Sequence, residues 1–195
     1  MSEVEQELLQ LLKERSLKTG GTFRLASGGT SSYYIDGKMI EVFSRGAYLI
    51  GEVLYEHTQD LDLDAIGGLE VGAVPLTTAA VIAYHRRGKE MEGFWVRDKV
   101  KGHGTEKLIE GNLKPGARVA LVDDVITQGG SLLKAFQAVR EIGCQVIRVL
   151  ALVDRLAGAD QRFREHGLIN YRPIFTIQDL GVAADAGGRA AGTSS

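Results

Sequence analysis

Hydrophobic and polar residues follow a helical period at the start of the chain and a strand-then-helix alternation after residue 65. Near the N-terminus, apolar residues recur at helical spacing at Val4, Leu8, Leu11 and Leu12. This spacing predicts an amphipathic helix over residues 3–17. After residue 65, short apolar runs alternate with longer helical patterns, which predicts an α/β fold with a mostly parallel central sheet flanked by helices.

The individual elements follow from the same patterns. Strands are expected at five apolar runs bounded by turn residues, 65–68, 93–96, 117–122, 145–153 and 171–177. Helices are expected at 75–85, 130–142 and 161–166, and a long glycine-containing loop is expected from Arg97 to Gly111. Upstream, two short strands are expected around 23–25 and 32–36, with turns at 19–21 and 27–32 and a helix over 44–57 capped by Ser44.

Length and composition are those of one globular domain. The chain has 195 residues, of which 44% are hydrophobic and 25% charged, enough to bury a core. We expect a single domain over residues 1–182. Residues 183–195 are almost all small or polar and have little to bury, which predicts a disordered tail.

Charge, hydropathy and cysteine content restrict the binding partners and the cellular location that we expect. A net charge of −2 provides no overall positive field, so no nucleic-acid partner is expected. No apolar run approaches the roughly 20 residues needed to span a bilayer, and the N-terminus lacks a secretory signal pattern. We therefore expect no membrane partner and a cytoplasmic location. The single cysteine, Cys144, excludes an internal disulfide, and its place at a strand start favours a buried apolar role over a nucleophile.

The strongest chemical pattern is a strand, a polar loop and a helix start. Four apolar residues, 119–122, are followed in order by Asp123, Asp124, Val125, Ile126, Thr127, Gln128, Gly129, Gly130 and Ser131. In an α/β sheet, ligands bind beyond the carboxyl ends of the strands. The two glycines let the backbone approach a ligand closely, and the hydroxyls and unpaired N–H groups of the helix start suit a phosphate.

The two carboxylates distinguish this loop from other phosphate sites. The chain has neither the Gly-Lys-Ser/Thr triplet of a P-loop nor a GxGxxG pattern after a strand. Carboxylates beside a phosphate repel it unless they face hydroxyls or a divalent cation, which a sugar phosphate and Mg²⁺ would supply. An isolated Asp-Asp pair would be an ordinary strand end, but the complete pattern favours a ribose-phosphate site.

Segment 119–131 resembles the 5-phosphoribosyl-1-pyrophosphate (PRPP) motif of the type I phosphoribosyltransferases. The resemblance implies that family's fold, with a small N-terminal hood formed mainly by residues 1–40 and a C-terminal segment. It implies that the whole stretch Asp123–Ser131 binds PRPP. Asp123 and Asp124 would contact ribose hydroxyls, and Thr127–Ser131 would hold the 5′-phosphate. Mg²⁺ is the implied cofactor, bound through PRPP with Asp124 as a candidate ligand.

Three further segments resemble the orotate phosphoribosyltransferases within this class. Residues 23–28 with 32–36 are similar to that family's N-terminal signature, 97–104 to its mobile catalytic loop, and 151–155 to a strand end that carries an orotate-contacting arginine. The resemblance implies transfer of the phosphoribosyl group from PRPP to orotate. The products would be orotidine 5′-phosphate and pyrophosphate, in pyrimidine (UMP) biosynthesis. It also implies a homodimer in which loop 97–110 acts in the partner's site.

The same resemblance assigns roles to individual residues. The implied catalytic residues are Arg97, Lys99, Lys101 and His103, and the implied orotate-binding residues are Thr127, Arg155, Tyr33 and Tyr34. The physics of the reaction independently favours a basic loop, because leaving pyrophosphate needs cations and closure excludes water. The alternative for the loop is a solvated basic turn. The alternatives for Arg155 are a salt bridge with Asp154 and a surface position.

Two substitutions depart from the family's pattern. Asp98 stands at a loop position where many relatives carry lysine, although Lys99 follows it. A carboxylate beside pyrophosphate is unfavourable unless it faces away or joins Mg²⁺. Ala26 stands where many relatives carry another lysine. These differences indicate a divergent subgroup with the same reaction.

Three other functions compete with this interpretation. A purine phosphoribosyltransferase would share the PRPP loop but would not explain segments 23–36 and 97–104. A PRPP-sensing regulator should carry an added DNA-binding segment or a basic RNA-binding face, and the sequence indicates neither. A phosphate-binding module such as a response regulator should pair the acids with a phosphoacceptor and lysine pattern, which the sequence lacks.

Overall fold

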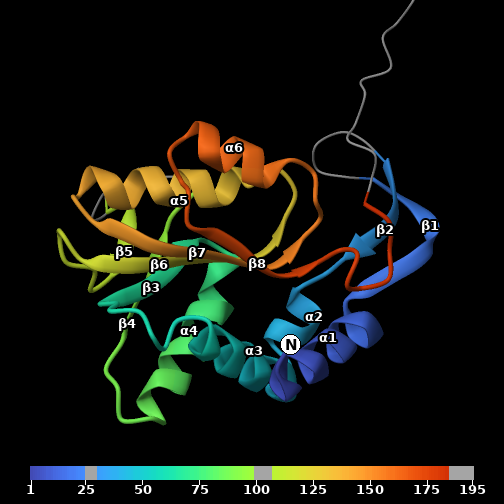
Figure 1. The fold of residues 1–195 in the computed structure, drawn as a ribbon, viewed down its shortest axis with the longest axis horizontal. Coiled ribbons are helices and arrows are strands. Elements are labelled where there is room, and N and C mark those ends of the chain that lie inside the picture. The colour runs from blue at the N-terminus through green and yellow to red at the C-terminus, as the bar shows by residue number, and fades with distance from the viewer. Residues whose placement is uncertain (25–29, 99–106, 185–195) are drawn as a thin grey trace, which may run out of the picture.

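A six-stranded sheet forms the centre of the protein (Figure 1). The computed structural model describes residues 1–24, 30–98 and 107–184. The sheet order is β5-β4-β3-β6-β7-β8, with bounds β3 (Ala65–Leu69), β4 (Glu92–Val96), β5 (Ile109–Gly111), β6 (Arg118–Ile126), β7 (Gln145–Asp154) and β8 (Tyr171–Thr176). All pairs are parallel except β4–β5. The mostly parallel α/β architecture expected from the sequence is confirmed.

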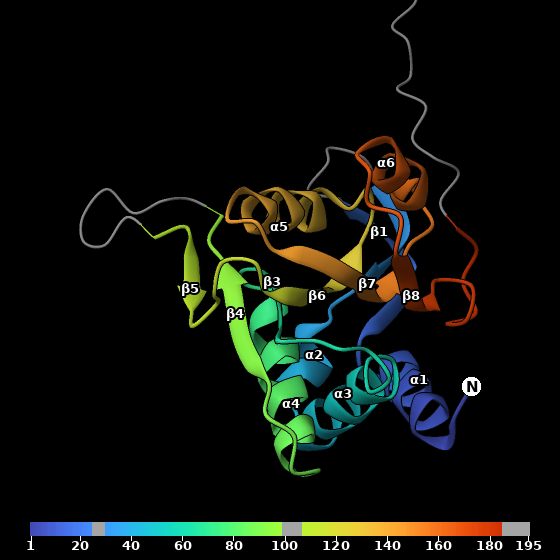
Figure 2. The ribbon, with the colours of Figure 1, turned by 60° about the vertical axis from the view of Figure 1, so that its left-hand side comes forward.

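Helices cover both faces of this sheet (Figure 2). One face carries α3 (Ser44–Glu56) and α4 (Ala73–His85), and the other carries α5 (Gly130–Glu141) and α6 (Ala159–Glu165). Because successive side chains of a strand point to opposite faces, β6 serves two cores. Ala120 and Val122 pack on the α3–α4 side, and Val119 and Leu121 pack on the α5–α6 side.

The N-terminal elements form a hood, which has its own two-stranded sheet but shares a hydrophobic core with the main sheet. It contains α1 (Glu3–Arg15), the antiparallel strands β1 (Leu17–Arg24) and β2 (Thr30–Ile35), and the short helix α2 (Lys38–Glu41). The turn expected at 19–21 is wrong, because β1 continues through it. The register shifts between Thr19 and Phe23, and Gly20 has φ +81°, so the turn-like residues form a bulge inside the strand.

Other boundaries differ from the predictions for local reasons. β6 continues to Ile126, so Asp123 and Asp124 lie within the strand rather than after it. The expected loop 97–111 ends in the edge strand β5, which at 3 residues is too short to give a periodic pattern. Ser44 is the first residue of α3, and Phe43 takes the N-cap position without a side-chain hydrogen bond. The single domain expected over 1–182 stays a prediction, and residues 185–195 of the expected tail lie outside the described part.

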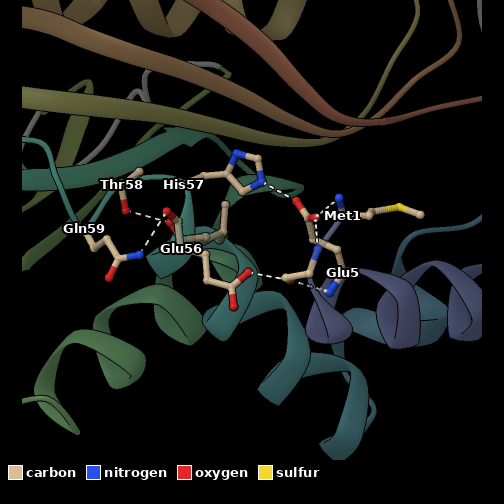
Figure 3. Close-up of polar contacts among 8 residues, drawn as sticks. Met1, Glu5, Glu56, His57, Thr58 and Gln59 are labelled. Atoms are coloured by element: carbon tan, nitrogen blue, oxygen red, sulfur yellow. Dashed lines mark hydrogen bonds and ion pairs between the residues drawn. The ribbon is translucent and has the colours of Figure 1, made fainter.

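Polar contacts fasten the start of α1 to the end of α3 (Figure 3). Ser2 and Glu5 form a capping box, and Ser2 Oγ also donates to Glu56 Oε2 at 2.7 Å. His57 Nε2 lies 2.7 Å from Glu5 Oε1, which gives this histidine a structural partner. None of the helices in the described ranges is long and apolar enough to cross a membrane. Cys144 is buried, as expected.

An ion pair between α3 and the residues just after α4 should make the free energy of unfolding depend on pH. Glu52 Oε2 lies 2.6 Å from Arg87 Nη2, and this hydrogen bond lowers the pKa of Glu52. A depressed carboxyl pKa adds stability above the unfolded-state pKa and loses it as the pH falls through the folded-state pKa. We expect Glu52→Gln to lower the free energy of unfolding by about 1 kcal/mol at pH 7, and the difference to shrink as the pH falls below the ordinary pKa of glutamate.

Urea unfolding at pH 7 and pH 3.5 measures this effect. Glu141→Gln, at an exposed glutamate at the end of α5, is the matched control and should leave stability unchanged at both pH values. An equal loss for Glu52→Gln at the two pH values would mean that the missing charge is not responsible.

Candidate active site

Three segments meet at the carboxyl end of β6. Asp123 and Asp124 come from β6, Gly72 precedes α4 at the end of β3, and Gly37 precedes α2. A Cβ atom added to Gly72 would lie 2.7 Å from Asp124 Oδ1, and one added to Gly37 would lie 3.0 Å from Asp124 Oδ2. Side chains at these positions would therefore displace the carboxylate. The glycines let two loops approach the acids at the edge where α/β proteins bind ligands.

Burial and mutual repulsion govern the charges of these acids. Burial, followed by the charge of Asp124, raises the pKa of Asp123 to about 8. Glu41 of α2 is only 4% exposed, and burial followed by the charge of Asp124 likewise raises its pKa to about 8. The nearby Lys38 ammonium opposes both shifts. Such crowded carboxyl groups favour ligands that bring hydroxyl donors or positive charge.

The β6–α5 loop has the geometry of an anion site. Thr127 and Gln128 are exposed, Gly129 is the N-cap of α5 with φ +69°, and Gly130 and Ser131 begin the helix. The first N–H groups of a helix lack intrahelical partners and form the positive end of its dipole. The loop therefore presents hydroxyl and N–H donors next to the acids. Val125 and Ile126 instead pack into the two cores through their side chains.

Arg155 connects the end of β7 to the hood. Its Nε donates to Tyr33 Oη at 3.1 Å, its Nη2 donates to Ser31 Oγ at 3.1 Å, and its guanidinium lies 4.6 Å from the Tyr33 ring centroid. Its backbone N–H donates to the Ile126 carbonyl at 3.0 Å, so Arg155 lies beside the start of the β6–α5 loop and Thr127. The surface position considered for this arginine is wrong, since it is 7% exposed.

The two tyrosines expected at one site lie on different faces of β2. Tyr33 is fully buried against Arg155, whereas Tyr34 is 39% exposed. The Tyr34 ring stacks on Phe23 at a centroid distance of 6.0 Å. Alternation along a strand separates neighbouring side chains in this way. The structure therefore brings Tyr33, but not Tyr34, to Arg155.

The described ends of the basic loop are held by ion pairs. Arg97 Nη2 lies 2.6 Å from Glu110 Oε1 across the β4–β5 pair. Asp98 Oδ1 lies 2.6 Å from Lys134 Nζ on α5, so the carboxylate that departs from the family's pattern faces a cation of its own chain. Lys99, Lys101 and His103 lie outside the described residues, as does Ala26.

Comparison with known proteins identifies the family. The model of the phosphoribosyl transferase domain matches residues 45–164. The orotate phosphoribosyltransferase of Aquifex aeolicus is 41% identical over 177 residues, which are 90% of this chain and 96% of that protein. The chain belongs to the orotate phosphoribosyltransferase family.

Solved structures of this family share the fold. The Mycobacterium tuberculosis orotate phosphoribosyltransferase in complex with Fe(III) dicitrate is 37% identical, with a TM-score of 0.79 over 92% of this chain and 99% of that one. The same enzyme in complex with PRPP is 35% identical, with a TM-score of 0.76 over 92% and 99% of the two chains. The type I phosphoribosyltransferase fold expected from the sequence is thereby confirmed.

Sequence reasoning missed four residues that surround the acids in this family member. Gly37, Lys38 and Glu41 belong to α2 and its start, and Gly72 belongs to the loop before α4. No periodic pattern marks a helix of 4 residues. The one available signal was glycine itself, since a glycine beside a predicted strand end often permits close backbone approach.

A methyl group at Gly129 should disturb the β6–α5 loop. A Cβ there would overlap the Phe163 ring of α6, and φ +69° is unfavourable for alanine. We expect Gly129→Ala to lower the free energy of unfolding by about 2 kcal/mol and to raise the KM for PRPP, because the loop must shift. Gly130→Ala is the matched control for stability, since its Cβ would meet no atom within 4 Å. Equal stability of the two variants, measured by thermal unfolding, would contradict the overlap.

Proposed function

We propose that this chain catalyses the transfer of the phosphoribosyl group from PRPP to orotate, giving orotidine 5′-phosphate and pyrophosphate in UMP biosynthesis. The observation that carries the proposal is the meeting of an acid pair, a helix-start anion loop and the buried Arg155 at one edge of the sheet. Family membership supports the same reaction. The cytoplasm is the setting we propose for it, in keeping with the free thiol of Cys144.

PRPP would bind along Asp123–Ser131. The Asp123 and Asp124 carboxylates would accept hydrogen bonds from the ribose hydroxyls, which relieves the repulsion among the acids. The 5′-phosphate would lie at the start of α5, where N–H groups and the Thr127 and Ser131 hydroxyls can donate to it. As pyrophosphate departs, the ribose gains positive charge that nearby carboxylates stabilise.

Orotate would bind between the hood and the β6–α5 loop. It is an anion, and Arg155 supplies a fixed cation whose guanidinium is oriented by Tyr33 and Ser31. Thr127 follows the carbonyl that accepts the Arg155 N–H, so it borders both substrates. Tyr34 was expected to line this pocket too, and its opposite orientation favours a role at the hood surface with Phe23.

Mg²⁺ would be held mainly by the substrate. The Asp124 carboxylate supplies hard oxygen ligands of the kind that Mg²⁺ prefers. Within ranges 1–24, 30–98 and 107–184, no group of three acidic, histidine or cysteine side chains could hold a metal by itself. PRPP oxygens would therefore complete the coordination. The cation would neutralise charge on the pyrophosphate group when bound.

The cations expected in the basic loop would stabilise the leaving pyrophosphate, in the partner subunit's site. We propose that Arg97, Lys99, Lys101 and His103 have this role in a homodimer. Tyr48 of α3 and Ile82 of α4 are exposed large apolar side chains that line one groove of about 430 Å³. Such a groove suits a second copy of the chain.

Subunit mixing tests the loop's action in the partner's site. Asp124→Asn and Lys101→Ala protomers, each nearly inactive, should regain about a quarter of wild-type activity when unfolded and refolded together, because half of the dimers are mixed and one site in each is complete. No recovery, with both variants dimeric by sedimentation, would place the loop in its own subunit's site.

A competition among bases tests the proposed reaction. Consumption of orotate with PRPP and Mg²⁺ is followed by absorbance, beside adenine, hypoxanthine and uracil. We expect turnover of orotate alone. Turnover of a purine instead would identify a purine enzyme, and tight PRPP binding without any turnover would identify a regulator.

A further inference from the structure

The backbone turn after β7 is fixed by the buried carboxylate of Asp154. This residue is 3% exposed, and its Oδ1 accepts the N–H of Leu156 at 2.7 Å. Leu156 has φ +58°, a left-handed conformation that costs free energy for a residue with a branched side chain. The bond to Asp154 therefore stabilises an unfavourable backbone conformation immediately after Arg155.

Tyr171 of β8 holds the other oxygen of that carboxylate. Its Oη donates to Asp154 Oδ2 at 2.8 Å, so the carboxylate is fixed from two directions. Burial, followed by the charge of Asp154, raises the pKa of Tyr171 above its ordinary value, so the phenol keeps its proton and donates at neutral pH. The Tyr171 ring packs edge-on against Phe163, with centroids 4.8 Å apart.

Arg155 projects from the turn that these contacts define. Its side chain runs to Tyr33 and Ser31 of the hood, whereas that of Asp154 runs to β8. Neighbouring residues at a strand end leave opposite faces. Asp154 and Tyr171 can therefore influence the guanidinium through the backbone, without touching a substrate that lies on the Arg155 side.

We propose that Asp154 and Tyr171 are positioning residues that hold Arg155 in the orientation that binds the anionic pyrimidine. The inference rests on the proposed function, because it takes orotate as the ligand of Arg155. It predicts an effect on one substrate only. Tyr171 reaches the Thr127–Ser131 loop only through its ring, which packs on Phe163 beside Gly129, so loss of its hydroxyl should change PRPP binding little.

Tyr171→Phe tests the inference with a matched control. The variant keeps the ring against Phe163 and removes only the hydroxyl. We expect the KM for orotate to rise about five-fold, with kcat and the KM for PRPP within about two-fold of wild type. Tyr84→Phe also removes one buried hydroxyl, which donates to Thr58 Oγ1 at 2.8 Å near the far end of α4, and should leave all three constants unchanged. An orotate KM within two-fold of wild type, or parallel changes in kcat and both KM values, would overturn the inference.

Hydrogen exchange of the Arg155 Nε–H gives a readout that needs no turnover. Its ¹⁵N-correlated signal is assigned by its disappearance in Arg155→Lys. We expect exchange to be about five-fold faster than in wild type in both Tyr171→Phe and Asp154→Ala. Asp154→Asn should restore part of the protection from exchange, because its amide retains one acceptor. Unchanged exchange would refute positioning. Failure of the wild-type protein to consume orotate, with this exchange pattern intact, would instead refute the proposed function.

Discussion

Asp124→Asn is expected to lower kcat/KM for PRPP by about 100-fold, while the fold remains intact. The substitution keeps the shape of the side chain between Gly37 and Gly72 and removes its negative charge. We expect the charged carboxylate to accept hydrogen bonds from the ribose hydroxyls and to face Mg²⁺. Stability should rise slightly or stay level, because the charge of Asp124 helps to raise the pKa values of Asp123 and Glu41 and therefore repels them.

Initial rates at varied PRPP concentration measure this effect, beside thermal unfolding of the same samples. Asp160→Asn is the matched control. Asp160 is an exposed aspartate of α6, and its Oδ2 lies 2.9 Å from Arg164 Nη2. It should leave kcat/KM unchanged. A loss of less than about three-fold for Asp124→Asn would contradict the placement of PRPP on the acids.

Arg155→Ala is expected to raise the KM for orotate by about 100-fold, because it removes the charge-assisted contact proposed for this anion. The variant also removes the two hydrogen bonds and the ring contact that join β7 to the hood. Stability should therefore fall as well. The KM for PRPP shows whether loss of the hood contacts disturbs the whole site, because PRPP is placed on the acids and the β6–α5 loop rather than against the hood.

Two further variants complete this experiment. Arg172→Ala removes an exposed arginine of β8 and should leave the KM for orotate unchanged. Arg155→Lys keeps the charge but cannot reproduce the planar guanidinium, so its KM should lie between those of wild type and Arg155→Ala. Equal rises in the KM values of orotate and PRPP for Arg155→Ala would show that Arg155 acts only as a structural tie to the hood.

Local, contiguous patterns were the predictable part of the molecule. The β6–α5 segment lies within one stretch of sequence, so its apolar run, acids, glycines and helix start could be interpreted together. The parallel sheet followed from the alternation of strands and helices. Short elements were missed because α2 and β5, of 4 and 3 residues, are too short for their hydrophobic pattern to repeat and so establish a period.

Contacts between distant segments were the unpredictable part. Glu41 reaches Asp124 from α2, and the side chain of Asp98 reaches Lys134 on α5. No spacing rule connects such pairs, because the sheet topology brings them together. Tyr33 and Tyr34 illustrate the reverse error: they are neighbours in sequence, yet strand alternation places only the first beside Arg155.

The reaction products test the central proposal most directly. The purified protein is incubated with equimolar orotate and PRPP in the presence of Mg²⁺, and the products are measured by ³¹P NMR and mass spectrometry. We predict orotidine 5′-phosphate and pyrophosphate in equal amounts, each matching the orotate consumed. Pyrophosphate without a nucleotide, or a nucleotide formed only when a purine replaces orotate, would contradict the proposed transfer.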